Sequence, residues 1–174
     1  MRTKKDPFAL ENLQASAACF SKCRKYRYVL RRVWDVSQPV CVFVGLNPST
    51  ADEKVNDPTV RRCMGYAYGW GYGGVVMMNL FALRATDPKV MLAHQDPVGK
   101  DNDFYLNLYA KVADATHAAI VCAWGAHGRH KQRSTAVRTL LMPYWPLRCL
   151  KKLASGEPGH PLYLKKDLRT IHYP

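Results

Sequence analysis

Polar side chains follow the apolar runs of this 174-residue chain at widely separated places. Asn47 and Ser49 come directly after the apolar run 41–45, Asn79 stands near the end of a second run, and His160 lies in a late loop. Amides and hydroxyls can hold a water molecule or read the polar edge of a ligand, and a neutral imidazole can donate a proton. The alternative explanations are a capped strand-to-helix connection, a buried asparagine that joins two loops and an ordinary loop histidine.

Asp52 and Asp57 are the carboxylates that lie closest in sequence to this first polar loop. A carboxylate beside a held water can act as a general base, whereas the amide of Asn47 cannot do so near neutral pH. Asp57-Pro58-Thr59 also has the pattern of a helix start, with an N-cap residue followed by proline. Capping is therefore the simpler role for Asp57, and a catalytic role stays open beside it.

These polar groups need strands and helices that bring them together. Short apolar or alternating runs predict strands over residues 26–34, 41–45, 75–80, 118–124 and 145–150, and residues 19–23 could pair with the first of them. Helical spacing and start signals predict helices over residues 58–70, 88–93, 101–115 and 127–141. Alternating strands and helices predict a three-layer α/β/α domain with a mostly parallel central sheet. The carboxyl edge of such a sheet is where ligands bind.

The length of the chain suits one domain. We expect a polar amino-terminal segment over residues 1–16 and a single domain over residues 17–174. No apolar run approaches the roughly 20 residues of a membrane helix, and the basic amino terminus lacks the apolar run of a secretory signal. We therefore expect a cytoplasmic monomer with no membrane partner. Cys19 and Cys23 have no second close pair beside them, so we expect no metal site and no other cofactor.

The chain is strongly basic. Its formal net charge is +13, from 26 lysine and arginine residues against 13 aspartate and glutamate residues. An imbalance this large in a short chain favours a polyanionic partner, first of all nucleic acid, bound with an affinity that falls with salt. A generally basic surface with no such partner is the alternative. The hydrophobic content of 48% excludes a disordered chain.

Motifs along nearly the whole chain resemble those of known families. The segments NPSTAD, DPTVRRC, WGYGG, NLFALRATDP, DPVGKDND and HPLYL resemble a bacterial and phage family labelled as a domain of unknown function. Within that pattern, GLNPS at residues 45–49, the run that carries Asn79 and the His-Pro pair at residues 160–161 resemble, in this order, three motifs of the uracil-DNA glycosylase superfamily. This second resemblance implies the fold of that superfamily. Residues 80–84 lack the cysteine of its iron–sulfur branches, so we expect no cluster.

The resemblance to the glycosylases implies hydrolysis of an N-glycosidic bond. In the transition state of that reaction the sugar becomes cationic and the base anionic, so a protein helps by stabilising both charges and by placing a water. The resemblance implies that Asn47 holds the water or docks the base, that Asn79 reads the base edge, and that His160 donates to the base oxygen. Asp57 is the carboxylate we expect to assist the water.

Further residues would bind the flipped nucleotide. A base must leave the duplex to be reached, and an aromatic side chain is then expected to stack on it. Tyr66 is our choice for the aromatic side chain that forms the floor of the base pocket, and Phe81 is another candidate. Aromatic side chains more often belong to the core. Pro48, Ser49 and Thr50 form the turn that we expect to hold a phosphate beside the flipped base.

Residues around the His-Pro pair and on the first long helix would bind the rest of the DNA. Leu162 or Tyr163 would fill the gap that the flipped base leaves, as apolar wedges do. Arg61, Arg62 and Lys165 would contact the DNA backbone. Each of these charges has a plain alternative as a solvated surface residue.

The sequence therefore predicts a monofunctional DNA glycosylase that flips a pyrimidine, either uracil or a modified base, and leaves an abasic site. The resemblance to a bacterial and phage family suggests DNA repair or antiviral defence as the setting, with hypermodified phage bases as targets. Two alternatives stay open. One is a non-catalytic module of the same fold that binds modified bases in DNA, and the other is a hydrolase of free nucleotides or nucleosides.

Overall fold

The computed structural model describes residues 13–144 and 146–174. Residues 1–12 of the expected amino-terminal segment, and residue 145 of one expected strand, lie outside this part. The described chain contains the strands β1 (Ala15–Phe20), β2 (Arg27–Val33), β3 (Val40–Gly45), β4 (Gly74–Asn79), β5 (Ile120–Cys122), β6 (Leu147–Cys149) and β7 (Ile171–His172). Its helices are α1 (Pro58–Gly69), α2 (Pro88–Ala93), α3 (Asn102–Ala115) and α4 (Arg133–Leu141), with the short 3-10 segments η2 (Ala126–Gln132) and η3 (Pro161–Tyr163).

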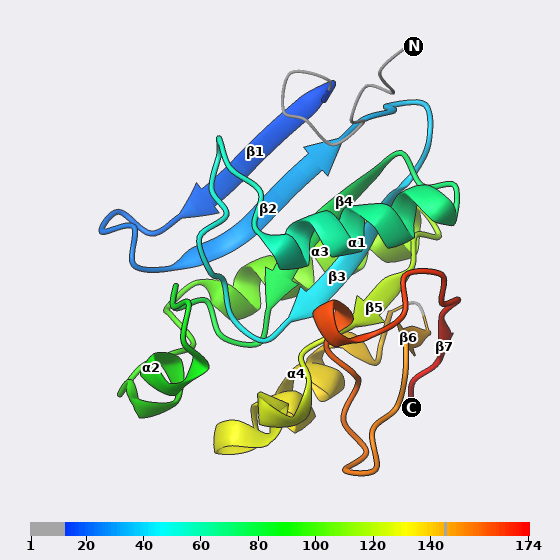
Figure 1. Cartoon of the computed structure of the whole chain (residues 1–174). Coiled ribbons are helices and arrows are strands. Elements are labelled where there is room, and N and C mark those ends of the chain that lie inside the picture. The colour runs from blue at the N-terminus through cyan, green and yellow to red at the C-terminus, as the bar shows by residue number, and fades with distance from the viewer. Residues whose placement is uncertain (1–12, 145) are drawn as a thin grey trace.

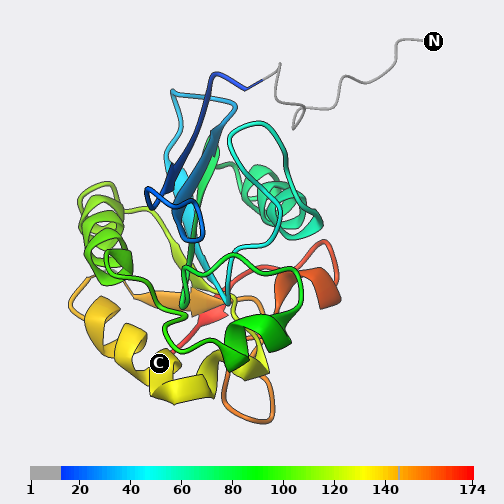
Figure 2. The same ribbon diagram turned by 90° about the vertical axis from the view of Figure 1, so that its left-hand side faces the viewer.

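The strands form one seven-stranded sheet in the order β1-β2-β4-β3-β5-β6-β7 (Figure 1). The four central strands β4, β3, β5 and β6 run parallel to one another. β2 and β7 pair antiparallel with the two ends of this parallel group, and β1 continues as a hairpin with β2. Figure 2 shows α1 and α3 on opposite sides of the sheet. The predicted three-layer α/β/α fold is confirmed.

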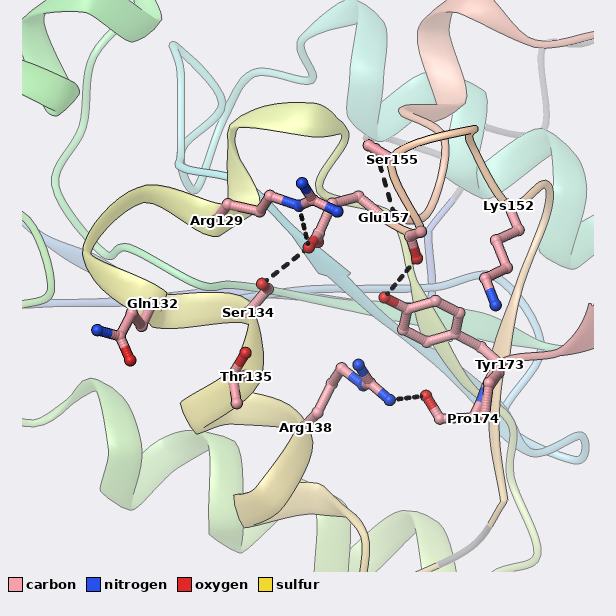
Figure 3. Close-up of a pocket in the computed structure, with 11 residues that line it drawn as sticks. Arg129, Gln132, Ser134, Thr135, Arg138, Lys152, Ser155, Glu157, Tyr173 and Pro174 are labelled. Carbon is pink, nitrogen blue, oxygen red and sulfur yellow. Dashed lines mark hydrogen bonds and ion pairs between the residues drawn. The ribbon is translucent and has the colours of Figure 1, made fainter.

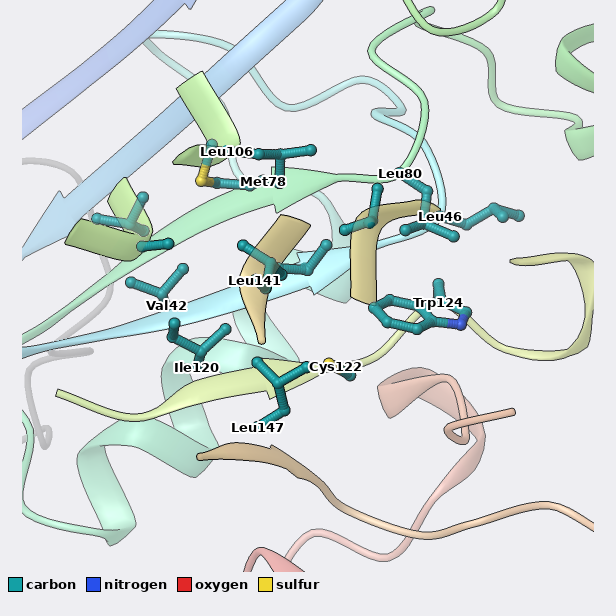
Figure 4. Packing of buried hydrophobic residues seen from close by; sticks show 14 of the residues in the cluster. Val42, Leu46, Met78, Leu80, Leu106, Ile120, Cys122, Trp124, Leu141 and Leu147 are labelled. Atoms are coloured by element: carbon teal, nitrogen blue, oxygen red, sulfur yellow. The ribbon is translucent and has the colours of Figure 1, made fainter. Parts of the chain in front are cut away.

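Both faces of the central strands are buried, which explains their continuous apolar runs. On one face, Val42, Ile120 and Leu147 pack with side chains of α3 and α4, among them Leu106 and Leu141 (Figure 4). On the other face, alternate strand residues such as those at positions 41, 43 and 121 pack with α1. The period of two along each strand therefore divides the apolar residues between two clusters.

The first hairpin differs from its prediction in its bounds. β1 begins at Ala15, inside the segment that was expected to precede the domain, and the turn lies at Ser21–Tyr26. This turn contains Arg24 in a left-handed conformation with φ of 56°, which apolar periodicity does not reveal. The short antiparallel strand β7 was not predicted, because two exposed residues carry no periodic signal. None of the helices in the described chain is long and apolar enough to cross a membrane.

The connections that follow the neighbouring strands β3 and β5 create a crevice. β3 is followed by α1, which lies on one face of the sheet, whereas β5 is followed by α4, which belongs to the other. Because the chain leaves these two neighbouring strands toward opposite faces, their carboxyl ends separate at a switch point. This is the edge of the sheet at which the sequence placed Asn47.

Candidate functional site

A cavity of about 730 Å³ opens at the carboxyl edge of the parallel strands, and we call it the edge cavity. All four parallel strands contribute to its wall through the segments that follow them. The lining residues are Leu46, Asn47, Ser49, Asp57, Pro58, Thr59, Ala85, Thr86, Pro88, Trp124, Gly125, Ala126, His127, Lys151, Leu153, Gly159, His160, Leu162, Tyr163 and Leu164. Three predicted catalytic residues, Asn47, Asp57 and His160, are therefore brought together.

Asn47 is fixed by hydrogen bonds to the loop that follows β4. Its Nδ2 donates to the carbonyl oxygen of Ala85 at 2.8 Å and to that of Pro48 at 3.1 Å. The backbone N–H of Ala85 returns a bond of 2.8 Å to the Pro48 carbonyl oxygen. Since these side-chain bonds use the amide as a donor, Oδ1 is the atom of Asn47 that is suited to accept a hydrogen bond from a ligand or a water.

Asp57 both caps α1 and lines the edge cavity. Its Oδ1 accepts from the backbone N–H of Val60 at 2.8 Å, so the side chain caps α1. The same residue lines the edge cavity while only 5% of its surface is exposed. One carboxylate oxygen thus accepts a hydrogen bond from the first turn of α1, while the side chain also lines the cavity. Asp52, the other nearby carboxylate, instead accepts from the N–H groups of Lys54 and Val55 in its own turn.

Two buried arginines of β2 hold the loop that leads to Asp57. Arg27 Nη1 donates to the carbonyl oxygen of Ala51 at 2.8 Å, and Arg32 Nε donates to Asn56 Oδ1 at 2.8 Å. Burial lowers the pKa of Arg27 to about 10, and the attraction of Asp57 opposes that fall. Arg27 therefore remains a cation at neutral pH, and its positive charge lies near Asp57.

His160 is held so that one ring nitrogen can donate. Its Nδ1 accepts from the backbone N–H of Leu162 at 3.4 Å, which assigns the ring proton of the neutral imidazole to Nε2. Burial lowers the pKa of His160, and Asp57 partly opposes this change, so the ring is neutral at pH 7. Gly125 lies against it with φ of 74°, and a Cβ there would come within 3.3 Å of the His160 Cβ.

The 3-10 segment η3 forms the outer rim of the cavity. Tyr163 is 83% exposed, and its ring centroid lies 5.4 Å from that of His160. Leu162 lines both the edge cavity and a shallow groove on α1, which is bounded by Pro58, Arg61, Arg62, Gly65 and Lys166. The predicted wedge residue Leu162 and the two arginines predicted to contact the DNA backbone therefore line the same groove. Arg62 also fixes the rim, because its Nη1 donates to the Leu164 carbonyl oxygen at 2.8 Å.

Other predicted binding residues lie beside the cavity. Thr50 lines a neighbouring hollow with Arg24, Lys25 and Arg84, and Ser49 lines this hollow as well as the edge cavity. Pro48 is buried in the turn beneath them. Lys165 is exposed near the rim without lining the described cavities, and its carbonyl oxygen accepts from the hydroxyl of Tyr66.

The structure does not support the base-reading role that was predicted for Asn79. Asn79 pairs with Gly45 inside the sheet, and only 4% of its surface is exposed. Its Oδ1 lies over the glycine, where an added Cβ would come within 2.9 Å of it. The chain after β4 stays buried and reaches the cavity only at Ala85. Within the described chain, the Asn79 Nδ2 is buried without a hydrogen-bond partner.

Neither aromatic candidate for the cavity floor lines the cavity. Tyr66 is 2% exposed and stacks on Trp70 at 5.5 Å in the cluster beneath α1, and Phe81 is fully buried on the other side of the sheet. The helical spacing that places Tyr66 near the first motif also turns it toward the core. The aromatic side chains that do line the cavity, apart from its histidines, are Trp124 and Tyr163.

Sequence reasoning missed Trp124 and His127 as cavity residues. Both follow β5, and the tryptophan-glycine pair that ends this apolar run was the available signal. His127 is exposed in the wall of the cavity, whereas the ring of His130, three residues later, lies next to that of Phe81. No group of three or more residues that could hold a metal ion is found among the described residues.

Residues 27–162, which are most of the chain, match a family described as "Protein of unknown function (DUF1643)". Neither the curated proteins nor the solved structures contain a match.

Proposed function

This chain belongs to the DUF1643 family of proteins of unknown function, and we propose that it is a monofunctional DNA glycosylase. The observation that carries the proposal is the meeting of Asn47, Asp57 and His160 in one cavity, although more than a hundred residues separate the first from the last. Together they supply an amide oxygen, a carboxylate and a neutral imidazole donor. Those are the groups that hydrolysis of an N-glycosidic bond requires.

Each group has a role that follows from its chemistry. As the bond breaks, positive charge grows on the sugar, and the Asp57 carboxylate stabilises it or takes a proton from the attacking water. Asn47 Oδ1 accepts a hydrogen bond from that water and orients it. The base leaves with negative charge on its oxygen, toward which His160 donates its Nε2 proton in a hydrogen bond. The low exposure of Asp57 strengthens these interactions, because less water screens them.

A polymeric substrate accounts for the surroundings of the cavity. The α1 groove contributes the cations Arg61, Arg62 and Lys166 on one side, and the hollow beside Thr50 contributes Lys25 and Arg84 on the other. Phosphates on both sides of a flipped nucleotide would meet these charges. The exposed Tyr163 stands at the rim, where an inserted ring can replace the flipped base in the stack.

The size of the cavity favours a modified base. Its volume of about 730 Å³ falls in the range of pockets that hold whole small-molecule ligands, and a bare pyrimidine ring would leave much of it empty. Apolar side chains such as Leu46, Leu153 and Leu164 form part of its wall. We therefore propose a pyrimidine with a bulky substituent, such as a hypermodified phage base, ahead of uracil.

The test is base release from a panel of duplexes that carry uracil, thymine mismatches, hydroxymethylated or glucosylated pyrimidines. Alkali cleavage reports the abasic sites. We expect product from at least one duplex, and we expect Asn47→Ala and His160→Ala each to abolish it while DNA binding persists. Binding without product from any duplex would favour a non-catalytic reader of modified bases. Product from free nucleosides alone would favour a nucleoside hydrolase, and full activity of both variants would refute the assigned site.

A further inference from the structure

A second hollow, of about 430 Å³, lies behind the wall of the edge cavity. Arg129, Arg138 and Lys152 extend into it from η2, from α4 and from the segment after β6, and we call it the cationic pocket (Figure 3). Its other lining residues are Gln132, Ser134, Thr135, Ser155, Gly156, Glu157, Tyr173 and Pro174. The proposed glycosylase activity makes no use of this pocket.

Glu157 is the acidic side chain of the cationic pocket, and its carboxylate accepts hydrogen bonds from three donors. One carboxylate oxygen accepts from Trp124 Nε1 at 2.6 Å. The other accepts from Ser134 Oγ at 3.1 Å and from Arg129 Nε at 3.4 Å. The side chain of Glu157 is only 9% exposed, so this pairing takes place mostly away from water. Arg138 and Lys152 are the other two cations of the pocket, and Glu157 is its acidic side chain.

Arg138 is held in place by the main chain of Pro174 and by the ring of Tyr173. Its guanidinium donates to a main-chain oxygen of Pro174, the last residue of the sequence, and lies 5.2 Å from the ring centroid of Tyr173. The Tyr173 hydroxyl donates in turn to the carbonyl oxygen of Gly156 at 3.3 Å. Among the described side chains, the carboxylates form no ion pair with Arg138 or Lys152. A fixed guanidinium is therefore presented beside an exposed ammonium group.

We propose that the cationic pocket binds a phosphate group. Three cationic side chains face one acidic side chain in this pocket, so it attracts an anion, and guanidinium and ammonium N–H groups form strong charge-assisted hydrogen bonds with phosphate oxygens. Lys152 adds a movable ammonium group, and the hydroxyls of Thr135 and Ser155 line the same hollow. Arg129 is 62% exposed and can turn from Glu157 toward the bound anion. The phosphate can come from the free anion or from the terminal phosphate of a nucleotide.

The site is physically separate from the edge cavity. Trp124 lines the edge cavity, while its partner Glu157 lines the cationic pocket, so this hydrogen-bonded pair forms part of the wall between them. The segment after β6 also contributes to both hollows. Lys151 lines the edge cavity, and Lys152 lines the cationic pocket. Phosphate binding therefore does not depend on the proposed glycosylase activity and can be tested in its absence.

The experiment is calorimetric titration of the full chain with inorganic phosphate at constant ionic strength. We expect saturable binding by the wild type, weakened by about tenfold or more in Arg138→Gln and in Lys152→Gln, since each loses one charge-assisted contact. Lys111→Gln removes the same charge from an exposed position on α3 and serves as the matched control. Circular dichroism checks that each variant is folded, and the exposed Lys152 is the variant least able to disturb folding.

A second arm distinguishes the two sources of the phosphate. Titration with thymidine 5′-monophosphate and with thymidine separates phosphate recognition from nucleoside recognition. Nucleotide binding that is tighter than that of inorganic phosphate and is lost in Lys152→Gln would assign a terminal nucleotide phosphate. Equal binding of both would assign the free anion. Absence of phosphate binding, or affinities in both pocket variants equal to that of Lys111→Gln, would overturn the proposal.

Discussion

The edge cavity and the cationic pocket share a wall but differ in what surrounds their polar groups. The edge cavity combines apolar side chains with a buried carboxylate, Asp57, and a neutral imidazole, His160. In the cationic pocket, the carboxylate of Glu157 accepts hydrogen bonds from three donors, and the other charged side chains are permanent cations. A carboxylate and a proton donor can stabilise opposite charges as they develop, whereas fixed cations can only hold an anion.

The difference follows from topology. The edge cavity stands where β3 and β5 diverge, so loops from all four parallel strands can bring chemically different groups to one point. The cationic pocket lies between η2, α4 and the chain after β6, where basic residues are close neighbours in sequence. A change in the first region should therefore alter base release, and a change in the second should alter phosphate binding alone.

The largest expected effect is at Asp57. We expect Asp57→Asn to reduce the rate of base release by about 100-fold or more, because the amide can neither accept a proton nor balance positive charge. Asparagine caps helices about as well as aspartate, so the loss should come without unfolding α1. Single-turnover excision and thermal unfolding measure the two effects. Asp57→Ala, which removes the cap as well, should lose the same activity and about 1 kcal/mol of stability. Unchanged excision by Asp57→Asn would leave capping as its only role.

A smaller loss is expected at the proton donor. His160→Gln should slow excision by about 10- to 100-fold, since glutamine keeps an N–H donor but in another position, and loss of a well-placed donor costs about 100-fold or more. His127→Gln is the matched control within the same cavity, because His127 is an exposed wall residue. Rates for the two variants on one substrate provide the comparison. Equal losses of excision rate in the two variants would contradict the role of the His160 imidazole as the donor to the leaving base.

The hydrogen bond between Trp124 and Glu157 in the shared wall should contribute to the free energy of unfolding. Trp124→Phe keeps an aromatic ring but removes the Nε1 donor, so one buried oxygen of Glu157 loses its partner. We expect a loss of about 1–3 kcal/mol in the free energy of unfolding, measured by urea denaturation. Trp124→Phe combined with Glu157→Gln should recover part of it, because a neutral amide is less costly to leave unpaired. If Trp124→Phe were as stable as the wild type, the Trp124–Glu157 hydrogen bond would not stabilise the wall between the edge cavity and the cationic pocket.

The smallest expected effect concerns pH. Since burial lowers the pKa of His160 in the folded protein below its ordinary value of 6.5, the unfolded chain binds a proton first as the pH falls. The wild type should therefore lose stability below about pH 6.5, and His160→Gln should lose less over the same range. Urea denaturation from pH 7.5 to pH 5 measures the difference, and the other histidines are common to both proteins. Parallel curves would contradict the burial of a neutral imidazole.

The sequence predicted the layers and the outline of the site because both depend on local signals. Apolar runs and helix-start residues located the parallel strands and α1, and strand ends located Asn47 at the ligand-binding edge. Side-chain direction was less accessible. Asn79 and Tyr66 were assigned to the site by their order along the chain, but strand register turns Asn79 over Gly45 and helix packing turns Tyr66 inward. The cationic pocket depends on long-range packing of η2 and α4, for which no local pattern exists.

We propose that the edge cavity, and not the cationic pocket, is where the base is cut from its sugar. It can be tested by filling each hollow with an equally large side chain. Ala126→Trp places an indole in the edge cavity, and Ser155→Trp places one in the cationic pocket. The measurement is single-turnover base release at saturating protein, with DNA binding measured in parallel. We expect Ala126→Trp to lose about 100-fold or more of the excision rate and Ser155→Trp to retain the wild-type rate. Wild-type excision by Ala126→Trp would contradict it.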